Sequence, residues 1–218
     1  MLIRSSSSLF LSLFLASFAA FVVIDAAPAM AEEVEPVDKN FSGALVGGNI
    51  YFGQAISVGD SSPGIAFLSS VEAGWGFARD TWKRTELTFE LGAGNLQFKK
   101  QSADKATVNV PVSFYGLAKA GFGYSIGSHA FAVMRLGAGP AFSKISQKAN
   151  GVTETADSTA AGYAFTVGMD LVAPATDNFY FVGGAHLRRM SFTSEIGPNS
   201  DVYQINIPLV NLGVRYRF

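Results

Sequence analysis

The chain has 218 residues and a formal net charge of −1, and charged residues make up 15% of it, against roughly 25% in typical soluble domains. A hydrophobic share of 49% with so little charge favours a membrane protein or a very large buried core, and the near-neutral balance excludes the basic face that a nucleic-acid partner requires. The absence of cysteine excludes disulfides, thiolate metal sites, a cysteine nucleophile and a lipidated N-terminal cysteine.

The N-terminal region has the pattern of a secretory signal peptide. Arg4 supplies the positive charge, Leu9–Ile24 is a largely apolar run, and Ala29-Met30-Ala31 forms a small-x-small cleavage site. The apolar run is shorter than the roughly 20 residues that a membrane-spanning helix needs, and acidic residues follow it. We therefore favour a cleaved signal peptide over a transmembrane helix.

Eight later segments alternate apolar with polar or small residues, as half-exposed β-strands do. In the clearest of them, Tyr163, Phe165 and Val167 alternate with Ala164 and Thr166. In chain order the predicted strands are Phe41–Gly53, Ile65–Arg79, Thr85–Phe98, Thr107–Tyr124, His129–Ser143, Gly162–Val172, Asn178–Thr193 and Tyr203–Phe218.

The last two predicted strands change parity along their length. The seventh begins with Phe181 on one face and ends with Phe192 on the other, and in the eighth the apolar residues are odd-numbered up to Leu209 and even-numbered afterwards. A slip of one residue moves every side chain to the opposite face. Because proline cannot donate to the β-ladder, we expect a β-bulge near Pro208 to absorb this slip.

The connections between the strands alternate longer and shorter, which is typical of barrels with short periplasmic turns and longer extracellular loops. The predicted connections are 54–64, 80–84, 99–106, 125–128, 144–158, 173–177 and 194–202. The even strand count and this alternation predict an all-β fold, an eight-stranded antiparallel up-and-down transmembrane β-barrel. The predicted domains are a signal peptide at residues 1–31, a periplasmic lead-in at 32–40 and an outer membrane β-barrel at 41–218.

A soluble, lipocalin-like barrel with an apolar interior is the architectural alternative. An eight-stranded interior has room only for side chains or one small ligand, so it cannot hold all the aromatic residues of these faces. Turned outward, the same residues contact lipid. We expect two aromatic girdles: Trp75, Phe77, Phe122, Tyr124, Phe179, Tyr216 and Phe218 on the periplasmic side, and Phe52, Phe67, Phe98, Phe142 and Tyr163 on the outer side.

The final strand alternates apolar and polar residues and ends on an aromatic residue at Phe218. Here the sequence resembles small bacterial outer membrane β-barrel proteins of the OmpA/OmpX type, a resemblance of pattern that transfers no functional residues. In that family the last strand is recognised by the barrel-assembly machinery. The resemblance therefore implies an assembly signal formed by Val210, Leu212, Val214, Tyr216 and Phe218, and a location in the outer membrane of a Gram-negative bacterium.

The face opposite the aromatic residues collects charge of both signs. We expect a lumen charge network of Glu72, Glu86, Glu90, Lys119, Arg135, Asp170, Arg188, Arg215 and Arg217, although parity does not fix Arg135 and Arg188. Buried charges are costly unless they are paired, so the balance of signs predicts hydrogen-bonded pairs that parity cannot assign. In so narrow a barrel we favour a plug over a polar pore.

Three functions are compatible with these observations. The first is a structural or surface-interaction protein that supports the envelope or presents its extracellular loops to a partner. The second is a narrow passive channel. The third is an outer-membrane lipid hydrolase with His186 as base, for which Ser191 and Glu195 are the nearest candidates in sequence.

We expect the first function, with no enzymatic activity and no cofactor. His129 and His186 have no neighbours at metal-ligand spacing, which makes a zinc site unexpected. The expected partners are outer membrane lipid and lipopolysaccharide, the barrel-assembly machinery and an extracellular partner at the loops, with no nucleic acid.

Overall fold

The structure is a computed structural model and describes residues 42–57, 64–78, 83–99, 107–126, 130–148, 156–196 and 199–218. The predicted signal peptide, residues 1–31, and the predicted lead-in, residues 32–40, lie outside the described residues, as does His129. Within the described ranges, no helix is long and apolar enough to cross a membrane.

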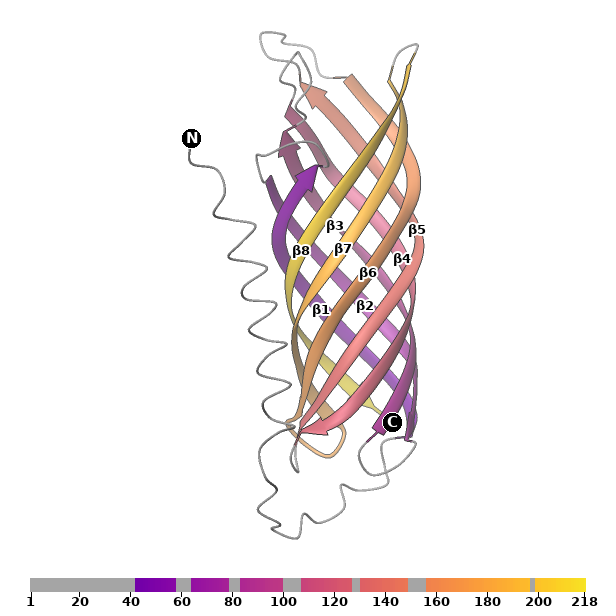
Figure 1. Cartoon of the computed structure of the whole chain (residues 1–218), viewed down its shortest axis with the longest axis vertical. Coiled ribbons are helices and arrows are strands. Elements are labelled where there is room, and N and C mark those ends of the chain that lie inside the picture. The colour runs from indigo at the N-terminus through magenta and orange to yellow at the C-terminus, as the bar shows by residue number, and fades with distance from the viewer. Residues whose placement is uncertain are drawn as a thin grey trace. The chain divides into compact units, whose positions relative to one another are not determined.

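Eight antiparallel strands close into a barrel in sequence order, which confirms the predicted fold class (Figure 1). Each strand pairs with its neighbours in the chain, and β1 pairs with β8 to close the barrel, with Leu45 opposite Arg217. The strands are β1 Gly43–Ser57, β2 Gly64–Ala78, β3 Lys83–Lys99, β4 Thr107–Ile126, β5 Ala130–Lys148, β6 Ala156–Pro174, β7 Phe179–Ile196 and β8 Asn199–Arg217.

Most strands extend beyond their predicted ends, and the difference that changes the predicted pattern is between β7 and β8. Residues 194–202 were expected to form a connection, but only residues 197–198 separate the two strands, so the predicted alternation of lengths fails there. The other connections at that end, 58–63, 100–106 and 149–155, are longer than 79–82, 127–129 and 175–178 at the opposite end. We therefore assign the end that holds the start of β1 and the end of β8 to the periplasm.

The prediction of a β-bulge near Pro208 is wrong. β7 and β8 pair in one continuous register from Phe179 opposite Tyr216 to Ile196 opposite Asn199. Alternation along β8 is unbroken: Leu209 and the odd-numbered apolar residues before it are buried inside, whereas Val210 and the even-numbered ones after it are exposed outside. The parity change in the sequence marks a change in the chemistry of the two faces, and the backbone does not slip.

A register shift occurs instead in β4. Its pairing with β5 shifts between Asn109 and Val112, and the pairing of β3 with β4 shifts between Gly94 and Leu96. Two residues of β4 near Pro111 therefore oppose one residue of each neighbour. The physical reason is the one expected for Pro208, since a proline nitrogen cannot donate to the ladder. Beyond this bulge the even-numbered Val110 faces the interior, although Phe114 faces outward.

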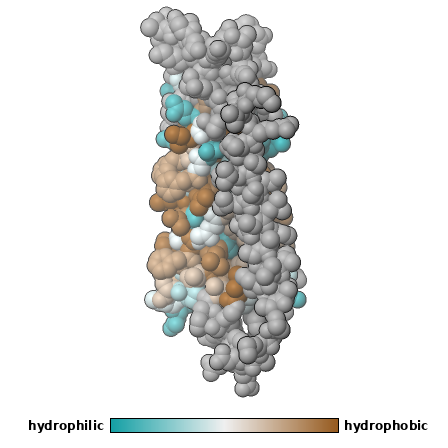
Figure 2. All heavy atoms as spheres, turned by 60° about the vertical axis from the view of Figure 1, so that its left-hand side comes forward, coloured by the Kyte–Doolittle hydropathy of each residue, from teal (hydrophilic) through white to brown (hydrophobic). Residues whose placement is uncertain are grey.

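The outer surface carries a broad apolar band, which we call the lipid-facing belt. Its members alternate with buried residues along every strand and have exposed fractions of about 40% or more. They include Val46, Phe52, Phe67, Val71, Trp75, Phe77, Leu87, Phe89, Phe114, Phe122, Tyr124, Met134, Phe142, Tyr163, Phe165, Phe181, Leu212, Val214 and Tyr216. On the face drawn in Figure 2, brown apolar residues make up much of the described wall, with teal residues toward its two ends.

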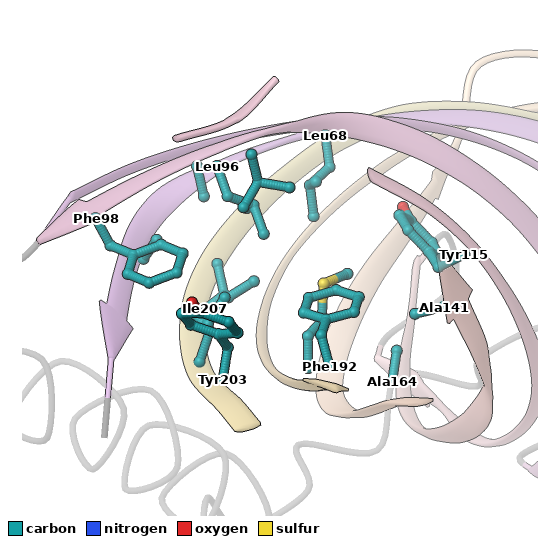
Figure 3. Close-up of a cluster of buried hydrophobic side chains, with 14 of the residues drawn as sticks. Leu68, Leu96, Phe98, Tyr115, Ala141, Ala164, Phe192, Tyr203 and Ile207 are labelled. Carbon is teal, nitrogen blue, oxygen red and sulfur yellow. The ribbon is translucent and has the colours of Figure 1, made fainter. Parts of the chain in front are cut away.

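Above the belt, on the extracellular side, the outward positions become largely polar. They include Gln97 on β3, Lys144 on β5 and Arg189 on β7, with Ile65 and Val202 as apolar exceptions. The interior changes in the opposite sense: its extracellular half is an apolar cluster (Figure 3). The cluster contains Tyr51, Ala55, Ala66, Leu68, Leu96, Phe98, Val110, Tyr115, Leu117, Ala141, Ile145, Ala160, Ala164, Met190, Phe192, Tyr203, Ile205, Ile207 and Leu209.

Phe98 is a correction to the predicted outer girdle. Its side chain is 1% exposed and lies in the apolar cluster beside Tyr203, with ring centroids 6.4 Å apart. The bulge that shifts parity lies in β4, so β3 keeps its even-numbered residues inside from Glu86 to Phe98. The remaining members of that girdle, Phe52, Phe67, Phe142 and Tyr163, are exposed on the outer surface.

Candidate functional site

The periplasmic half of the interior contains a dense set of charged side chains, which we call the charged network. The structure places inside the barrel all the residues predicted for the lumen, each with an exposed fraction of 8% or less. They are Glu72, Glu86, Glu90, Lys119, Arg135, Asp170, Arg188, Arg215 and Arg217. Arg135 and Arg188, whose orientation parity left open, have no exposed surface.

Glu72 and Glu86 lie between several cations near the middle of the network. Lys119 Nζ donates to Glu72 Oε2 at 2.8 Å, and Arg215 Nη2 donates to Glu72 Oε1 at 2.5 Å. Glu86 accepts from Arg135 Nη2 at 2.6 Å and from Arg215 Nη1 at 3.3 Å. Arg84 also donates to Glu86. Each carboxylate therefore has cations from more than one strand, which is what makes buried charge tolerable.

Glu90 connects the charged network to the apolar cluster. Its carboxylate accepts from Lys119 Nζ at 2.5 Å and from Arg188 Nη2 at 3.1 Å. The hydroxyls of Tyr51 and Tyr115 also donate to it, at 3.2 and 3.1 Å. The Arg188 guanidinium lies over both tyrosine rings, 4.9 Å from the centroid of Tyr51 and 4.2 Å from that of Tyr115. The hydroxyl of each tyrosine therefore binds a charged carboxylate, whereas its ring belongs to the apolar cluster.

Asp170 forms the remaining group of contacts. Its carboxylate lies 2.6 Å from Arg135 Nε and 2.8 Å from His186 Nε2, and it accepts from Asn211 Nδ2 at 3.1 Å. The His186 ring packs against Gly168, where an added Cβ would lie 2.2 Å from Nδ1. Gly168 therefore supplies the space that the imidazole occupies. Among the described residues, no group of histidine and carboxylate side chains could hold a metal ion.

Sequence reasoning missed several members of this site. Arg84 was placed in a connection, whereas it is the second residue of β3 and its side chain is buried inside the barrel. Tyr51, Tyr115 and His186 were not assigned to the network. For Tyr51 and Tyr115 the alternation did predict an inward side chain, because both share a face with small or polar residues. A buried tyrosine usually needs a partner for its hydroxyl, and this was the signal that could have found both.

The candidate hydrolase residues do not come together. His186 is five residues from Ser191 on the unbroken strand β7, so the two side chains point to opposite faces of the barrel wall. His186 faces the interior, in step with Arg188 and Met190. The side chain of Glu195 lies outside the described residues. This geometry does not form a serine–histidine pair.

The residues of the predicted assembly signal line one outer face of β8. Val210, Leu212, Val214, Tyr216 and Phe218 have exposed fractions between 41% and 71%. The rings of Tyr216 and Phe218 contact each other edge to face, with centroids 5.0 Å apart, and the Phe218 amide donates to Ala44 O at 3.1 Å. The last aromatic residue is therefore held at the β1–β8 closure and faces outward at the periplasmic rim.

Phe218→Ser is expected to lower the amount of protein inserted into the outer membrane, because it removes the terminal aromatic side chain without breaking a backbone pair. The matched control is Tyr124→Ser, which removes another exposed periplasmic aromatic residue, on β4. The measurement is the fraction of heat-modifiable protein in outer membranes after equal expression. An equal loss in both variants would show a general girdle effect and contradict a role specific to the last strand.

No family model matches the sequence and no curated protein matches it. Solved structures with a similar arrangement include Neisserial surface protein A, at 18% identity over 81% of this chain and 98% of that chain, with a TM-score of 0.48. The attachment invasion locus protein of Yersinia pestis, in complex with the heparin analogue sucrose octasulfate, is 14% identical over 80% and 99% of the two chains, with a TM-score of 0.43. A major outer membrane protein from Thermus thermophilus is 11% identical over 81% and 99%, with a TM-score of 0.45.

The location of the barrel follows from its two faces. An exposed apolar belt around a charged interior is stable only where hydrocarbon surrounds the wall, and a closed barrel leaves no backbone edge unsatisfied there. The chain is therefore an eight-stranded β-barrel of the bacterial outer membrane.

Proposed function

We propose that this outer membrane barrel does not conduct and has a structural or surface-interaction role, supporting the envelope or presenting its extracellular strands and connections to a partner. The observation that carries the proposal is that side chains fill the lumen at two successive levels. Glu90, Arg135 and Arg188 of the charged network and Leu68, Leu96 and Ile205 of the apolar cluster have no exposed surface. A continuous column of water would expose them.

The two levels exclude water for different physical reasons. In the charged network, ion pairs hold long side chains across the lumen, as between Arg188 of β7 and Glu90 of β3, which lie on opposite sides of the barrel. In the apolar cluster, aliphatic and aromatic side chains fill the lumen, and the buried hydroxyls of Ser143 and Ser113 at this level hydrogen-bond to each other at 2.9 Å. An eight-stranded barrel is narrow enough for side chains alone to fill it at both levels.

The extracellular part of the barrel supports the surface role. Polar outward positions around an apolar interior are the arrangement of a water-soluble barrel, so the strands continue beyond the belt as a rigid extension. On its outer wall Arg189 of β7 donates to Gln204 of β8 at 2.6 Å. Such a wall holds the connections between strands in a fixed position, where a partner could bind. The belt itself contacts lipid, and lipopolysaccharide is the expected outer-leaflet component.

The refolded wild-type protein is expected to be silent in a planar lipid bilayer, because either level alone closes the lumen. Phe192→Ala should stay silent because the charged network remains, and a variant combining Glu90→Ala with Arg135→Ala should stay silent because the apolar cluster remains. A gel shift between unboiled and boiled samples identifies the folded fraction of each protein. The measurement is single-channel conductance at equal amounts of folded protein.

Discrete conductance steps from folded wild-type protein would overturn this proposal. If Arg135→Ala also changed the ion selectivity of those steps, the narrow-channel hypothesis would replace it.

A further inference from the structure

A groove crosses the lipid-facing belt over β1, the strand that closes the barrel against β8. Its lining comes from β1, β2, β3 and β8, with one residue of β7. The outward apolar residues along it include Val46, Val71, Phe89, Leu91 and Val214. Its volume is about 460 Å³, within the range of roughly 300–1,000 Å³ that small-molecule sites occupy. The groove is therefore large enough for part of a ligand.

Gly48 lies at the centre of this groove. It occupies an outward position between Val46 and Ile50, and it pairs with Val71 on one side and Val214 on the other. Among the described residues, the nearest atom to a Cβ added there would be the Ser70 carbonyl oxygen at 3.7 Å, an ordinary contact. Neither close packing nor a left-handed backbone requires glycine here. The missing side chain instead leaves the groove open.

The wall of the groove on β3 explains why nearby side chains do not fill this space. Gly116 of β4 is another glycine in an outward position, but a Cβ there would lie 3.4 Å from both the Phe89 ring and Leu91 Cδ2. Those two side chains of β3 therefore extend toward β4 and cover Gly116. They lean away from β1, and Gly48 stays uncovered on their other side.

The groove begins at the periplasmic rim of the belt. Phe179, the first residue of β7, and Tyr216 near the end of β8 line that end, whereas Leu91 lies in the middle of β3. The groove is continuous with the belt, so hydrocarbon of the periplasmic leaflet surrounds it. Within hydrocarbon, van der Waals packing decides which surface an apolar partner prefers. A chain in a groove contacts protein atoms on several sides, and a chain on a convex wall contacts them on one.

We propose that this groove binds one acyl chain of a phospholipid from the periplasmic leaflet. A second copy of the barrel fits the groove less well. In a symmetric dimer the same patch of each subunit faces its equivalent, so two grooves would meet and enclose an unfilled space. Close packing disfavours such a space, whereas a flexible acyl chain can follow the groove and fill it. This site goes beyond the proposed surface role, because it lies in the membrane and on the outer wall.

The test is native mass spectrometry of the refolded protein in octyl glucoside with increasing amounts of phosphatidylethanolamine. The wild type is expected to retain one lipid per barrel in a saturable way. Gly48→Leu should lose this retained lipid, because its side chain occupies the groove. The matched control is Gly183→Leu, which adds the same side chain at an outward position of β7 outside the groove. An added Cβ there would lie 3.8 Å from Leu212 Cδ2, so it fits equally well, and this variant should retain the lipid.

Ala73→Leu, on β2, fills the same groove from its other side and provides a second variant. The gel shift between unboiled and boiled samples shows which variants are folded. Lipid retention that survives both substitutions in the groove, an equal loss in Gly183→Leu, or no saturable retention by the wild type would overturn the proposal. A dimer of the wild type that Gly48→Leu abolishes would make a second copy the occupant, and would overturn it too. None of these outcomes depends on whether the lumen conducts.

Discussion

Replacing Glu90 with alanine is expected to lower the free energy of unfolding of the barrel by about 3–5 kcal/mol, the usual cost of removing one partner from a buried charge pair. Glu90 has no exposed surface and accepts hydrogen bonds from Lys119, Arg188 and two tyrosines. Without it, Lys119 retains Glu72, whereas Arg188 loses its carboxylate partner in the described interior and keeps the faces of two aromatic rings. The cost is therefore concentrated on Arg188.

If the lost stability comes from the unpaired charge of Arg188, removing that charge should restore part of it. Combining Glu90→Ala with Arg188→Met should recover part of the lost stability, because the uncompensated charge disappears while most of the side-chain volume remains. Asp177→Ala removes an exposed carboxylate between β6 and β7 and should change stability by about 0.5 kcal/mol or less. Equilibrium unfolding in urea with lipid vesicles measures all three. If Glu90→Ala proves no less stable than Asp177→Ala, the charged network does not stabilise the barrel.

Phe192→Ala is expected to destabilise the barrel by about 3–5 kcal/mol, because it leaves a cavity in a fully packed region. Phe192 has no exposed surface and lies in the apolar cluster among Leu68, Tyr203 and Ile207 (Figure 3). Neither water nor lipid reaches this position to replace the lost ring. Phe192→Leu keeps most of the volume and should cost about 1.5 kcal/mol or less.

The matched control for Phe192 is Phe181→Ala on the same strand. Phe181 is 57% exposed on the lipid-facing belt, where lipid chains can occupy the space of the missing ring. Its replacement should cost roughly half as much as that of Phe192, or less. The same urea titration measures both variants. Equal losses at the two positions would contradict a packed apolar interior in the extracellular half of the barrel.

In the last two strands, alternation alone led to a wrong prediction about the backbone. Met190, Phe192, Ile205 and Ile207 have the spacing of an outward apolar face that has slipped by one residue, and so they predicted a bulge near Pro208. They are instead inward residues above the membrane, where water surrounds the wall and the apolar face must turn inside. Sequence periodicity reports which residues share a face, and the surrounding solvent decides which face is apolar.

The sequence by itself determined the number of strands, their order and the two faces of β1, β2 and β6, because a strand alternates with a period of two whatever its neighbours are. It also separated the charged residues from the belt. Only the tertiary structure decided that Glu72 meets Arg215, 143 residues away, and that Glu90 meets Arg188, 98 residues away. Those contacts depend on the register and tilt with which eight strands close, and the bulge near Pro111 changes the register locally. No local pattern contains this information, since closure is a property of all the strands together.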